Sequence, residues 1–382
     1  MANLFFIHTP LELFVAQQII NSEQLHNNIM LYGYEGSNKH YMVIYDTIII
    51  DTMWQEKVLM EDVDVWATIH RRDFYASILR VRKRIEELEE IINRYNVKSL
   101  YFGDMNNLSC KFGSFYFKKK GLRICFFEEG AGHYVFEPIE MKGGIILNYL
   151  YGVLADIFLF MPVCHMKFGA YCFWKDLHFD KLPIDQRYSI RPFYNESFDK
   201  LVIVHKLFSR QLIEILRNDL NLVQSEESIF LMTTPVYRVI RDTKRAKEAY
   251  IHVLDSFFYS LEKSLVIYLK FHPSDQEEER EIVKNLILKH GLKFKIIGNN
   301  INVPVEYYLQ YREFREIVSF YSATVLYNGY LFPKMQFYSL LDAYYKQCKL
   351  MGIRNLKRLE IILESEHQTM KSDFYFNPLY ID

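Results

Sequence analysis

The sequence predicts an α/β protein with two domains, each built on a parallel sheet. The first observation is length, because 382 residues exceed one ordinary domain and suit two domains of about 190 residues each. The second is the alternation of short apolar runs with helical patterns in both halves of the chain, which is typical of parallel sheets covered by helices. The third is that 50% of the residues are hydrophobic, which is enough to form a core in each half.

The N-terminal half opens with a strand, a short polar loop and a helix. Residues 4–7 form an apolar run, and Thr9 and Pro10 are suited to cap and begin a helix over 10–21. Further strands are expected over 29–34, 41–51 and 100–102, and a highly charged helix is expected over 72–95. This order of elements is typical of the start of a doubly wound sheet.

The C-terminal half repeats the alternation after a predicted linker. That linker covers residues 180–196 and contains two of the ten prolines, so we place the boundary between domains 1–183 and 184–382. The expected strands cover 228–232, 264–271, 294–298 and 317–320, and the expected helices cover 241–263, 277–290 and 304–309.

A stretch in the first half, residues 122–136, reads LRICFFEEGAGHYVF and carries the strongest chemical signal there. Its apolar residues predict a buried strand that leads directly into Glu128 and Glu129, and Gly130 allows a sharp turn. Ligands of open α/β sheets bind just beyond the carboxyl ends of the strands. One of two neighbouring carboxylates at such a place can act as a general base, although a solvated turn is the alternative interpretation.

A second signal is His272, which ends a predicted strand in the stretch KFHP, residues 270–273. Proline fixes the turn that follows the imidazole. Ser274 and Asp275 are expected to cap the next helix, whose positive end would then lie beside the imidazole and favour a phosphate. A phosphate there would raise the pKa of His272. The alternative is a structural histidine that only makes hydrogen bonds.

Hydroxyl groups and one carboxylate follow further predicted strands. Thr233 and Thr234 come after one strand, and Ser322 and Thr324 come after another. Hydroxyls at such junctions bind phosphate, but they cap helices equally well. Glu306 lies between the histidine and the serine turn, where it could accept hydrogen bonds from ribose hydroxyls or simply begin a helix.

Composition excludes several classes of protein. The net charge of −1 provides no basic field for a nucleic acid. The five cysteines form no CxxC pair, which favours reduced thiols and a cytoplasmic location. The N-terminus lacks the charged region of a signal peptide, and no apolar run is long enough to span a membrane. Residues 144–162 come closest, so peripheral association with the inner face of the membrane is compatible with the sequence, as is a homodimer.

Four motifs in this order resemble those of bacterial sialyltransferases. They are EEG at 128–130, HP at 272–273, Pro-x-Glu at 304–306 and the serine/threonine turn at 322–324. The opening FIHTPLELFVAQQII, residues 6–20, also resembles glycosyltransferase family 52, which sialylates lipooligosaccharide and capsular polysaccharide. The resemblance spans nearly the whole chain but rests on few specific residues. One departure is Ala323, which separates Ser322 from Thr324.

This resemblance implies a GT-B fold, in which two Rossmann-like domains face a central cleft. It implies transfer of N-acetylneuraminic acid from its CMP conjugate to a galactose-terminated glycan of a bacterial capsule or lipooligosaccharide. The N-terminal domain would serve the acceptor and the C-terminal domain the donor, in a single inverting displacement. Another sugar-nucleotide transferase of the same fold, or a non-catalytic protein that binds or assembles surface polysaccharide, are the alternatives.

The resemblance also assigns roles to residues. Glu129 would take the proton of the acceptor hydroxyl, and His272 would supply a proton or positive charge to the leaving phosphate. The expected donor-binding residues are Lys270, Pro273, Glu306, Ser322, Thr324, Thr233 and Thr234. The expected acceptor-side residues or reserve bases are Glu128, Asp104 and Thr9, with Asp255 as a further reserve.

One pattern, Asp62-Val63-Asp64, is typical of metal-dependent transferases. Its acids alternate with apolar residues, so it predicts an exposed strand face instead. Cys164, His165 and Cys172 do not match the spacing of a common zinc site. A monophosphate leaving group does not demand a metal clamp, and we therefore expect neither a metal nor another cofactor.

Overall fold

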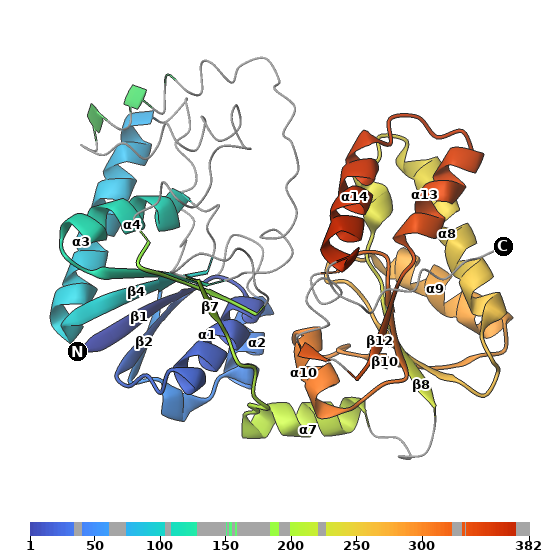
Figure 1. The fold of residues 1–382 in the computed structure, drawn as a ribbon, viewed down its shortest axis with the longest axis horizontal. Coiled ribbons are helices and arrows are strands. Elements are labelled where there is room, and N and C mark those ends of the chain that lie inside the picture. Colours follow the sequence, from blue (N-terminus) through green and yellow to red (C-terminus); the bar gives the residue numbers. More distant parts are fainter. Residues whose placement is uncertain are drawn as a thin grey trace. The chain divides into compact units, whose positions relative to one another are not determined.

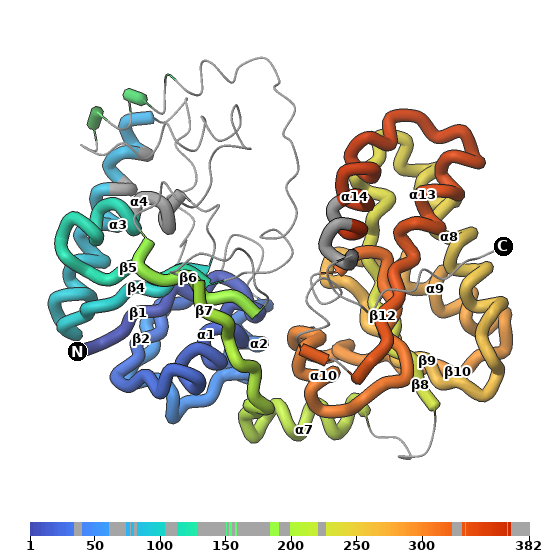
Figure 2. The backbone as a smooth tube through the Cα atoms, viewed as in Figure 1, coloured from blue at the N-terminus to red at the C-terminus, as the bar shows by residue number. Residues whose placement is uncertain are grey.

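The protein is described by a computed structural model that covers most of the chain. The described residues are 1–33, 40–60, 74–103, 108–127, 150, 153–154, 157–158, 184–190, 199–220, 227–322, 331–332 and 334–371. They fall into two compact units, one that starts at Met1 and ends at Ser209 and one whose main part starts at Arg210. Figures 1 and 2 show the two units.

The described part of the first unit is a parallel sheet of seven strands with helices on both faces (Figure 1). The strand order is β3-β2-β1-β4-β5-β6-β7, so β1 and β4 are adjacent although two strands separate them in sequence. The strands are β1 (Ala2–Ile7), β2 (Asn28–Tyr32), β3 (Glu56–Leu59), β4 (Val97–Phe102), β5 (Arg123–Phe127), β6 (Gln186–Ser189) and β7 (Asp199–Leu201). The helices are α1 (Pro10–Ser22), α2 (His40–Ile48), the 3-10 helix η1 (Asp51–Met53), α3 (Phe74–Tyr95) and α4 (Leu108–Lys119).

Alternation along β1 divides the core of this unit between the two faces of the sheet. Leu4 and Phe6 pack with buried residues of α3 and α4. Phe5 points to the opposite face, where its ring stacks on Tyr101 at a centroid distance of 4.2 Å and meets the edge of Trp54 at 5.6 Å. Successive side chains of a strand point to opposite faces, so one short apolar run contributes to both layers.

Two predictions for this unit were wrong. Residues 41–51 were expected to form a strand, but residues 40–48 form the helix α2, because Ile44, Tyr45 and Ile48 share one helical face and are buried beside α1. Burial of that face outweighs the strand preference of a β-branched run. The linker expected over 180–196 contains β6, which pairs in parallel with β5.

The boundary between the two units therefore lies later than residues 183 and 184. Strands β6 and β7 extend the first sheet to Leu201, and the first unit ends at Ser209. The two prolines of the stretch suggested a linker, but Arg187 and Tyr188 are buried within β6.

The described part of the second unit is a parallel sheet of five strands in the order β10-β9-β8-β11-β12. This is the order of the first five strands of a doubly wound dinucleotide-binding fold. The strands are β8 (Ser228–Met232), β9 (Val266–Lys270), β10 (Lys293–Ile297), β11 (Glu316–Ser319) and β12 (Gln336–Ser339). The helices are α7 (Arg210–Asp219), the 3-10 helix η6 (Val236–Val239), α8 (Thr243–Ser260), α9 (Glu277–Lys289), α10 (Val305–Tyr311), α13 (Leu341–Leu350) and α14 (Lys357–Lys371).

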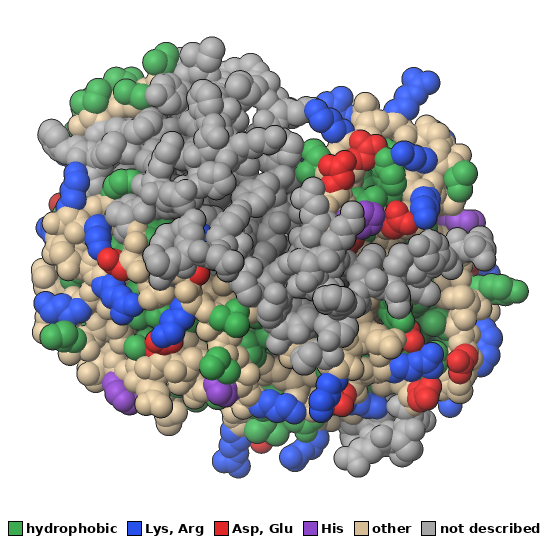
Figure 3. All heavy atoms as spheres, viewed as in Figure 1, with side chains coloured by type: hydrophobic (Ala, Val, Ile, Leu, Met, Phe, Trp, Pro, Cys, Tyr) green, Lys and Arg blue, Asp and Glu red, His purple; other side chains and the backbone are tan. Residues whose placement is uncertain are grey.

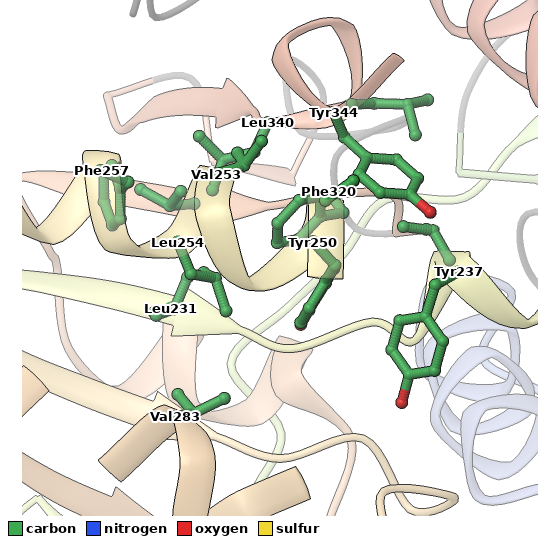
Figure 4. Packing of buried hydrophobic residues seen from close by; sticks show 14 of the residues in the cluster. Leu231, Tyr237, Tyr250, Val253, Leu254, Phe257, Val283, Phe320, Leu340 and Tyr344 are labelled. Carbon is green, nitrogen blue, oxygen red and sulfur yellow. The ribbon is translucent and has the colours of Figure 1, made fainter. Parts of the chain in front are cut away.

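Helix α8 fills the core on one face of the second sheet. Figure 4 shows Tyr250, Val253 and Phe257 of α8 directed toward the sheet, where they join Leu231 of β8 in one buried cluster. On the opposite face Phe230 contacts Tyr308 and Phe314 through their rings. Two parallel sheets, each covered by helices, confirm the predicted α/β fold class.

The surface carries no large field of one sign in the view of Figure 3, where basic and acidic side chains are interspersed over the described residues. This agrees with the net charge of −1. Among the described helices, none combines the length and the apolar character that a membrane span requires.

A buried acid joins the C-terminal helix to the second sheet. Glu366 of α14 is fully buried, and its Oε2 lies 2.9 Å from the Oγ of Ser339 at the end of β12. The Oγ of Ser339 also lies 3.1 Å from the carbonyl oxygen of Phe320, to which it can donate its single hydrogen, so a protonated Glu366 can act as the donor to Ser339. Burial raises the pKa of Glu366 to about 8, with the hydrogen bond to Ser339 acting against this shift and the charge of Asp342 adding to it.

We predict that the free energy of unfolding falls as the pH rises toward 8. The folded-state pKa of Glu366 lies above its value in the unfolded chain, so the unfolded chain loses this proton first. The slope approaches about 1.4 kcal/mol per pH unit between roughly pH 4.5 and 8. Urea unfolding at several pH values should show this slope in the natural chain and a smaller one in Glu366→Gln. Equal slopes in the two proteins would contradict the assignment.

Candidate active site

The candidate site lies at the carboxyl edge of the second sheet, where β9, β8 and β11 end side by side. Thr233 and Thr234 follow β8, His272 follows β9, and Ser322 follows β11. The strand order reverses between β8 and β11, and ligands of open α/β sheets bind at such a reversal. The structure thus brings together strand ends that are separated by up to about ninety residues in sequence.

The turn that carries His272 is held by two side chains. The backbone N–H of His272 lies 2.9 Å from the Oγ1 of Thr233 and 2.9 Å from the Oδ2 of Asp275. The hydroxyl of Thr233 donates to the same carboxylate oxygen. Asp275 closes the turn, since its own N–H donates to the carbonyl of His272 at 2.9 Å. The position of the histidine is therefore determined by two adjacent strands.

The imidazole of His272 contacts Ser274 through one nitrogen. Its Nδ1 lies 2.8 Å from the Oγ of Ser274 and 3.2 Å from the backbone nitrogen of Ser274. Although the residue is exposed, desolvation by its surroundings lowers the pKa of His272 below the ordinary value. Asp275 opposes this shift, while Arg238 and Lys270 add to it. The ligand-free site therefore favours a neutral imidazole.

Sequence reasoning missed Arg238, which lies in η6 immediately after the strand-end threonines. Its Nη1 donates to the carbonyl and to the hydroxyl of Ser274, each at 3.0 Å. Its Nη2 donates to the Oε2 of Glu279 at 2.6 Å, and the hydroxyl of Tyr237 donates to the other oxygen of that carboxylate. The only signal in the sequence was a basic residue four positions after Thr234.

Helix α9 does not begin as predicted. Ser274 and Asp275 were expected to cap it, but its N-cap is Gln276, whose N–H donates to Glu279 at 2.9 Å. The carboxylate of Asp275 instead accepts hydrogen bonds in the turn that carries His272. The first turn of α9 consists of Glu277, Glu278 and Glu279. Three carboxylates there offset the positive end of the helix, so this terminus does not provide the anion site that the sequence suggested.

The hydroxyls of the two threonines bond neighbouring turns, and their role in donor binding stays a prediction. Thr233 was expected to bind the donor, but its hydroxyl hydrogen goes to Asp275. Thr234 donates to the carbonyl of Tyr321 at 2.9 Å and so connects β8 to the turn after β11. A threonine has one hydroxyl hydrogen, so neither residue can donate to a phosphate while these bonds persist. Both residues hold the turns that frame the site.

Lys270 and Glu306 are buried beside the site. Lys270 ends β9, its ammonium donates to the Oδ1 of Asn302, and it lies 5.5 Å from the ring centre of Tyr308. Desolvation lowers the pKa of Lys270 to about 8, against the opposing charges of Glu306 and Asp219. Glu306 lies in the first turn of α10 and is only 3% exposed, so it begins a helix as well as facing a buried cation.

The remaining predicted donor-side residues are placed only in part. Pro273 is exposed in the turn after His272. Ser322 is half-buried beside the end of β8, with its Oγ 3.9 Å from the sulfur of Met232. Thr324 lies outside the described residues.

The base predicted for the acceptor, Glu129, also lies outside the described residues, as do Glu128 and Asp104. The strand before the acidic pair is β5, which ends at Phe127 as predicted. Asp255 lies on α8 and is bonded to Lys289 and His290, which lower its pKa. A carboxylate held in that way is a poor base, so we remove Asp255 from the candidates.

Thr9 caps α1 as predicted. Its Oγ1 accepts the N–H of Glu12 at 3.2 Å, and the carboxylate of Glu12 accepts the N–H groups of His8 and Thr9. Glu12 is fully buried against Gly103, where an added Cβ would lie 2.0 Å from its Oε1. The polar groups at this edge of the first sheet therefore hold the loop after β1.

The described residues contain no group of histidine, cysteine and acidic side chains that could hold a metal ion. Asp62, Asp64 and the stretch with Cys164, His165 and Cys172 lie outside the described residues. Whether the reaction uses a metal therefore stays a prediction.

Comparison with known proteins identifies a family. The model of the family described as "Alpha-2,8-polysialyltransferase (POLYST)" matches residues 3–341. A comparison with curated sequences finds no match.

Among solved structures, the UDP-GlcNAc 2-epimerase from Neisseria meningitidis is 10% identical with a TM-score of 0.47, covering 97% of this chain and 92% of that one. Sucrose-phosphate synthase from Thermosynechococcus elongatus is also 10% identical, with a TM-score of 0.45 and coverage of 98% and 95%. Both TM-scores are below 0.5.

We predict that two substitutions shift the pKa of His272 in opposite directions. Asp275→Asn removes an anion that raises this pKa, so the value should fall further. Arg238→Gln removes a cation that lowers it, so the value should rise. NMR titration of the imidazole measures both, and the exposed Arg241→Gln serves as a matched control that leaves the pKa unchanged. Shifts in the same direction would contradict this electrostatic account.

Proposed function

This chain belongs to the alpha-2,8-polysialyltransferase family and is a CMP-sialic acid-dependent sialyltransferase, and we propose that it lengthens a sialic acid chain on a bacterial surface glycan. The observation that carries the proposal is the family match, which covers residues 3–341 and so includes both sheets. Sialyl transfer agrees with the expected class of enzyme. The likeness of the N-terminus to glycosyltransferase family 52 stays a prediction.

The linkage in the family name bears on the acceptor. An α2,8 bond joins C2 of the incoming sugar to the oxygen on C8 of the sugar that receives it, and sialic acid supplies such a hydroxyl. The proposed acceptor is therefore a glycan that already ends in sialic acid, such as capsular polysialic acid. The galactose-terminated acceptor expected from the sequence is the second candidate, as the residue on which a first sialic acid would be placed.

The proposed reaction is a single displacement at C2 of the donor sugar. Glu129 takes the proton of the attacking hydroxyl, and the bond between C2 and the phosphate oxygen breaks with its electron pair going to CMP. His272 donates to that phosphate, and Arg238 and Lys270 supply positive charge nearby, as their effect on the pKa of His272 indicates. Donors placed where negative charge develops lower the barrier.

The other residues proposed to contact the sugar-nucleotide donor are assigned from their positions after the strands of the second sheet. Ser322 and Thr324 would hold the phosphate. Glu306 would accept a hydrogen bond from the ribose hydroxyls once the nucleotide displaces the groups that bury this carboxylate. We place the reaction in the cytoplasm, because Cys125 and Cys348 are buried free thiols and reduced cysteines are typical there. The proposal retains the homodimer and the peripheral membrane association that the sequence analysis found compatible with the chain.

The test is transfer of labelled sialic acid from its CMP conjugate to oligosialic acid and, in parallel, to a panel of galactosides. We expect elongation of oligosialic acid with products that an α2,8-specific sialidase removes. Turnover should persist in excess EDTA, because a monophosphate leaving group needs no metal clamp. Transfer to galactosides alone would overturn the proposed acceptor. If EDTA abolished turnover and Mn²⁺ restored it, Asp62 and Asp64 would again be candidate metal ligands.

We predict different kinetic effects for the two catalytic candidates and one binding residue. Glu129→Gln should lower kcat by about 10² or more while CMP still binds, the usual scale for a positioned base. His272→Ala should lower kcat by about 10² to 10³, the scale for one donor to a developing anion. Ser322→Ala should weaken mainly donor binding, because a neutral hydroxyl meets the phosphate before and during the reaction. Full turnover in Glu129→Gln, with loss in Glu128→Gln, would move the base by one residue.

A further inference from the structure

The hydrogen bonds around His272 determine which ring nitrogen carries the proton. The backbone nitrogen of Ser274 lies 3.2 Å from Nδ1 of the imidazole and directs its hydrogen at it. A backbone N–H can only donate, so Nδ1 must accept. A neutral imidazole that accepts at Nδ1 carries its hydrogen on Nε2.

The side chain of Ser274 reinforces this arrangement through Arg238. The Oγ of Ser274 accepts a hydrogen bond from Nη1 of Arg238 at 3.0 Å and lies 2.8 Å from Nδ1 of His272. An arginine has no acceptor, so the hydroxyl hydrogen of Ser274 is available for Nδ1. Arg238 is itself held by Glu279, whose carboxylate it contacts at 2.6 Å. A chain of hydrogen bonds thus connects α9 through η6 to the imidazole, with Arg238 donating both to Glu279 and to Ser274.

We propose that Arg238 and Ser274 are positioning residues that hold His272 as the neutral Nε2–H tautomer, so that it acts on the leaving phosphate as a hydrogen-bond donor and not as an acid. This rests on the proposed function, in which the phosphate of CMP-sialic acid lies beside His272. It departs from the imidazolium that the sequence analysis expected. The physical reason is that a second ring proton would have to sit on Nδ1, where it would face two donors.

The electron and proton balance of the reaction is complete without an acid. The acceptor hydroxyl forms a bond to C2 of the donor sugar and gives its proton to Glu129. The bond from C2 to the phosphate oxygen breaks, and its electron pair leaves with CMP, which departs as the dianion. The Nε2–H bond of His272 stays intact throughout. A phosphate monoester needs no proton to depart near neutral pH, since its second pKa is about 6.

The charges around the ring agree with this role. Arg238 from η6 and Lys270 from β9 disfavour the imidazolium, whereas Asp275 in the turn favours it. Glu279 from α9 is engaged by Arg238 and by the hydroxyl of Tyr237. The carboxylate of Asp275 accepts from the backbone N–H of His272 and does not bond the ring in the described structure. In the described structure, no carboxylate bonded to Nδ1 therefore offsets the effect of Arg238 and Lys270 on the imidazole.

The first test reads the tautomer directly. Nitrogen NMR of protein labelled at histidine, with His272→Gln to assign the signal, should show an unprotonated Nδ1 and a protonated Nε2. The pattern should hold in the ligand-free protein and after addition of CMP. The kcat of the natural enzyme should stay level as the pH rises above about 6.5, the ordinary histidine pKa. A protonated Nδ1, or a kcat that falls tenfold per pH unit above the pKa of His272, would overturn the proposal.

The second test uses variants of the positioning residues. Ser274→Ala should lower kcat about tenfold, leave KM for the donor within about twofold, and raise the pKa of His272. Ser274→Thr restores the hydroxyl and should restore kcat. Arg238→Gln should behave like Ser274→Ala, whereas Arg241→Gln, a nearby exposed arginine, should behave like the natural enzyme. Unchanged kcat and unchanged ring signals in Ser274→Ala would refute the positioning role.

The two tests separate this inference from the function on which it rests. The NMR experiment needs neither donor nor acceptor. An Nε2–H signal in a protein that transfers no sialic acid would refute the proposed function and leave the tautomer assignment standing. Sialyl transfer by a protein whose Nδ1 is protonated would do the reverse.

Discussion

The second unit depends on one constraint, the shared capture of the backbone N–H of His272 by Thr233 and Asp275. These residues follow two neighbouring strands, so the bond can form only when β8 and β9 are paired in register. Because these bonds join the ends of two strands, the turn is part of the fold as well as of the site. The precise placement of the imidazole therefore comes from sheet pairing.

The hydroxyls of the strand-end threonines are likewise used in hydrogen bonds within the fold. Each threonine after β8 donates its single hydroxyl hydrogen to a neighbouring turn. Thr233 donates to the turn after β9, and Thr234 donates to the turn after β11. The site is thus framed by bonds between the three strands. The proposed donor to the ligand is instead the Nε2–H of His272.

Electrostatics in the site follows from what is buried around it. Lys270 is desolvated at the end of β9, and Arg238 is anchored by Glu279, so two cations lie near the histidine without a carboxylate on its ring. The three glutamates that open α9 remove the usual attraction of a helix N-terminus for anions. In the proposed reaction, positive charge for the leaving phosphate therefore comes from side chains and not from the helix.

The sequence by itself determined the fold class, most of the strands and the position of His272, because these follow from local patterns. Apolar runs of four to six residues bounded by turn residues predict buried parallel strands, and proline after histidine predicts the exposed turn. The N-cap at Thr9 and the start of α1 at Pro10 were likewise local, and both are confirmed.

Tertiary structure decided what local patterns leave open. Residues 40–48 became the helix α2 because one helical face is buried beside α1, and residues 186–189 became β6 because β5 offered an edge with which to pair. Arg238 entered the site because η6 brings it within 3.0 Å of Ser274, thirty-six positions away in sequence. Contacts of this kind depend on which strands become neighbours, and the period of a single segment carries no information about its neighbours.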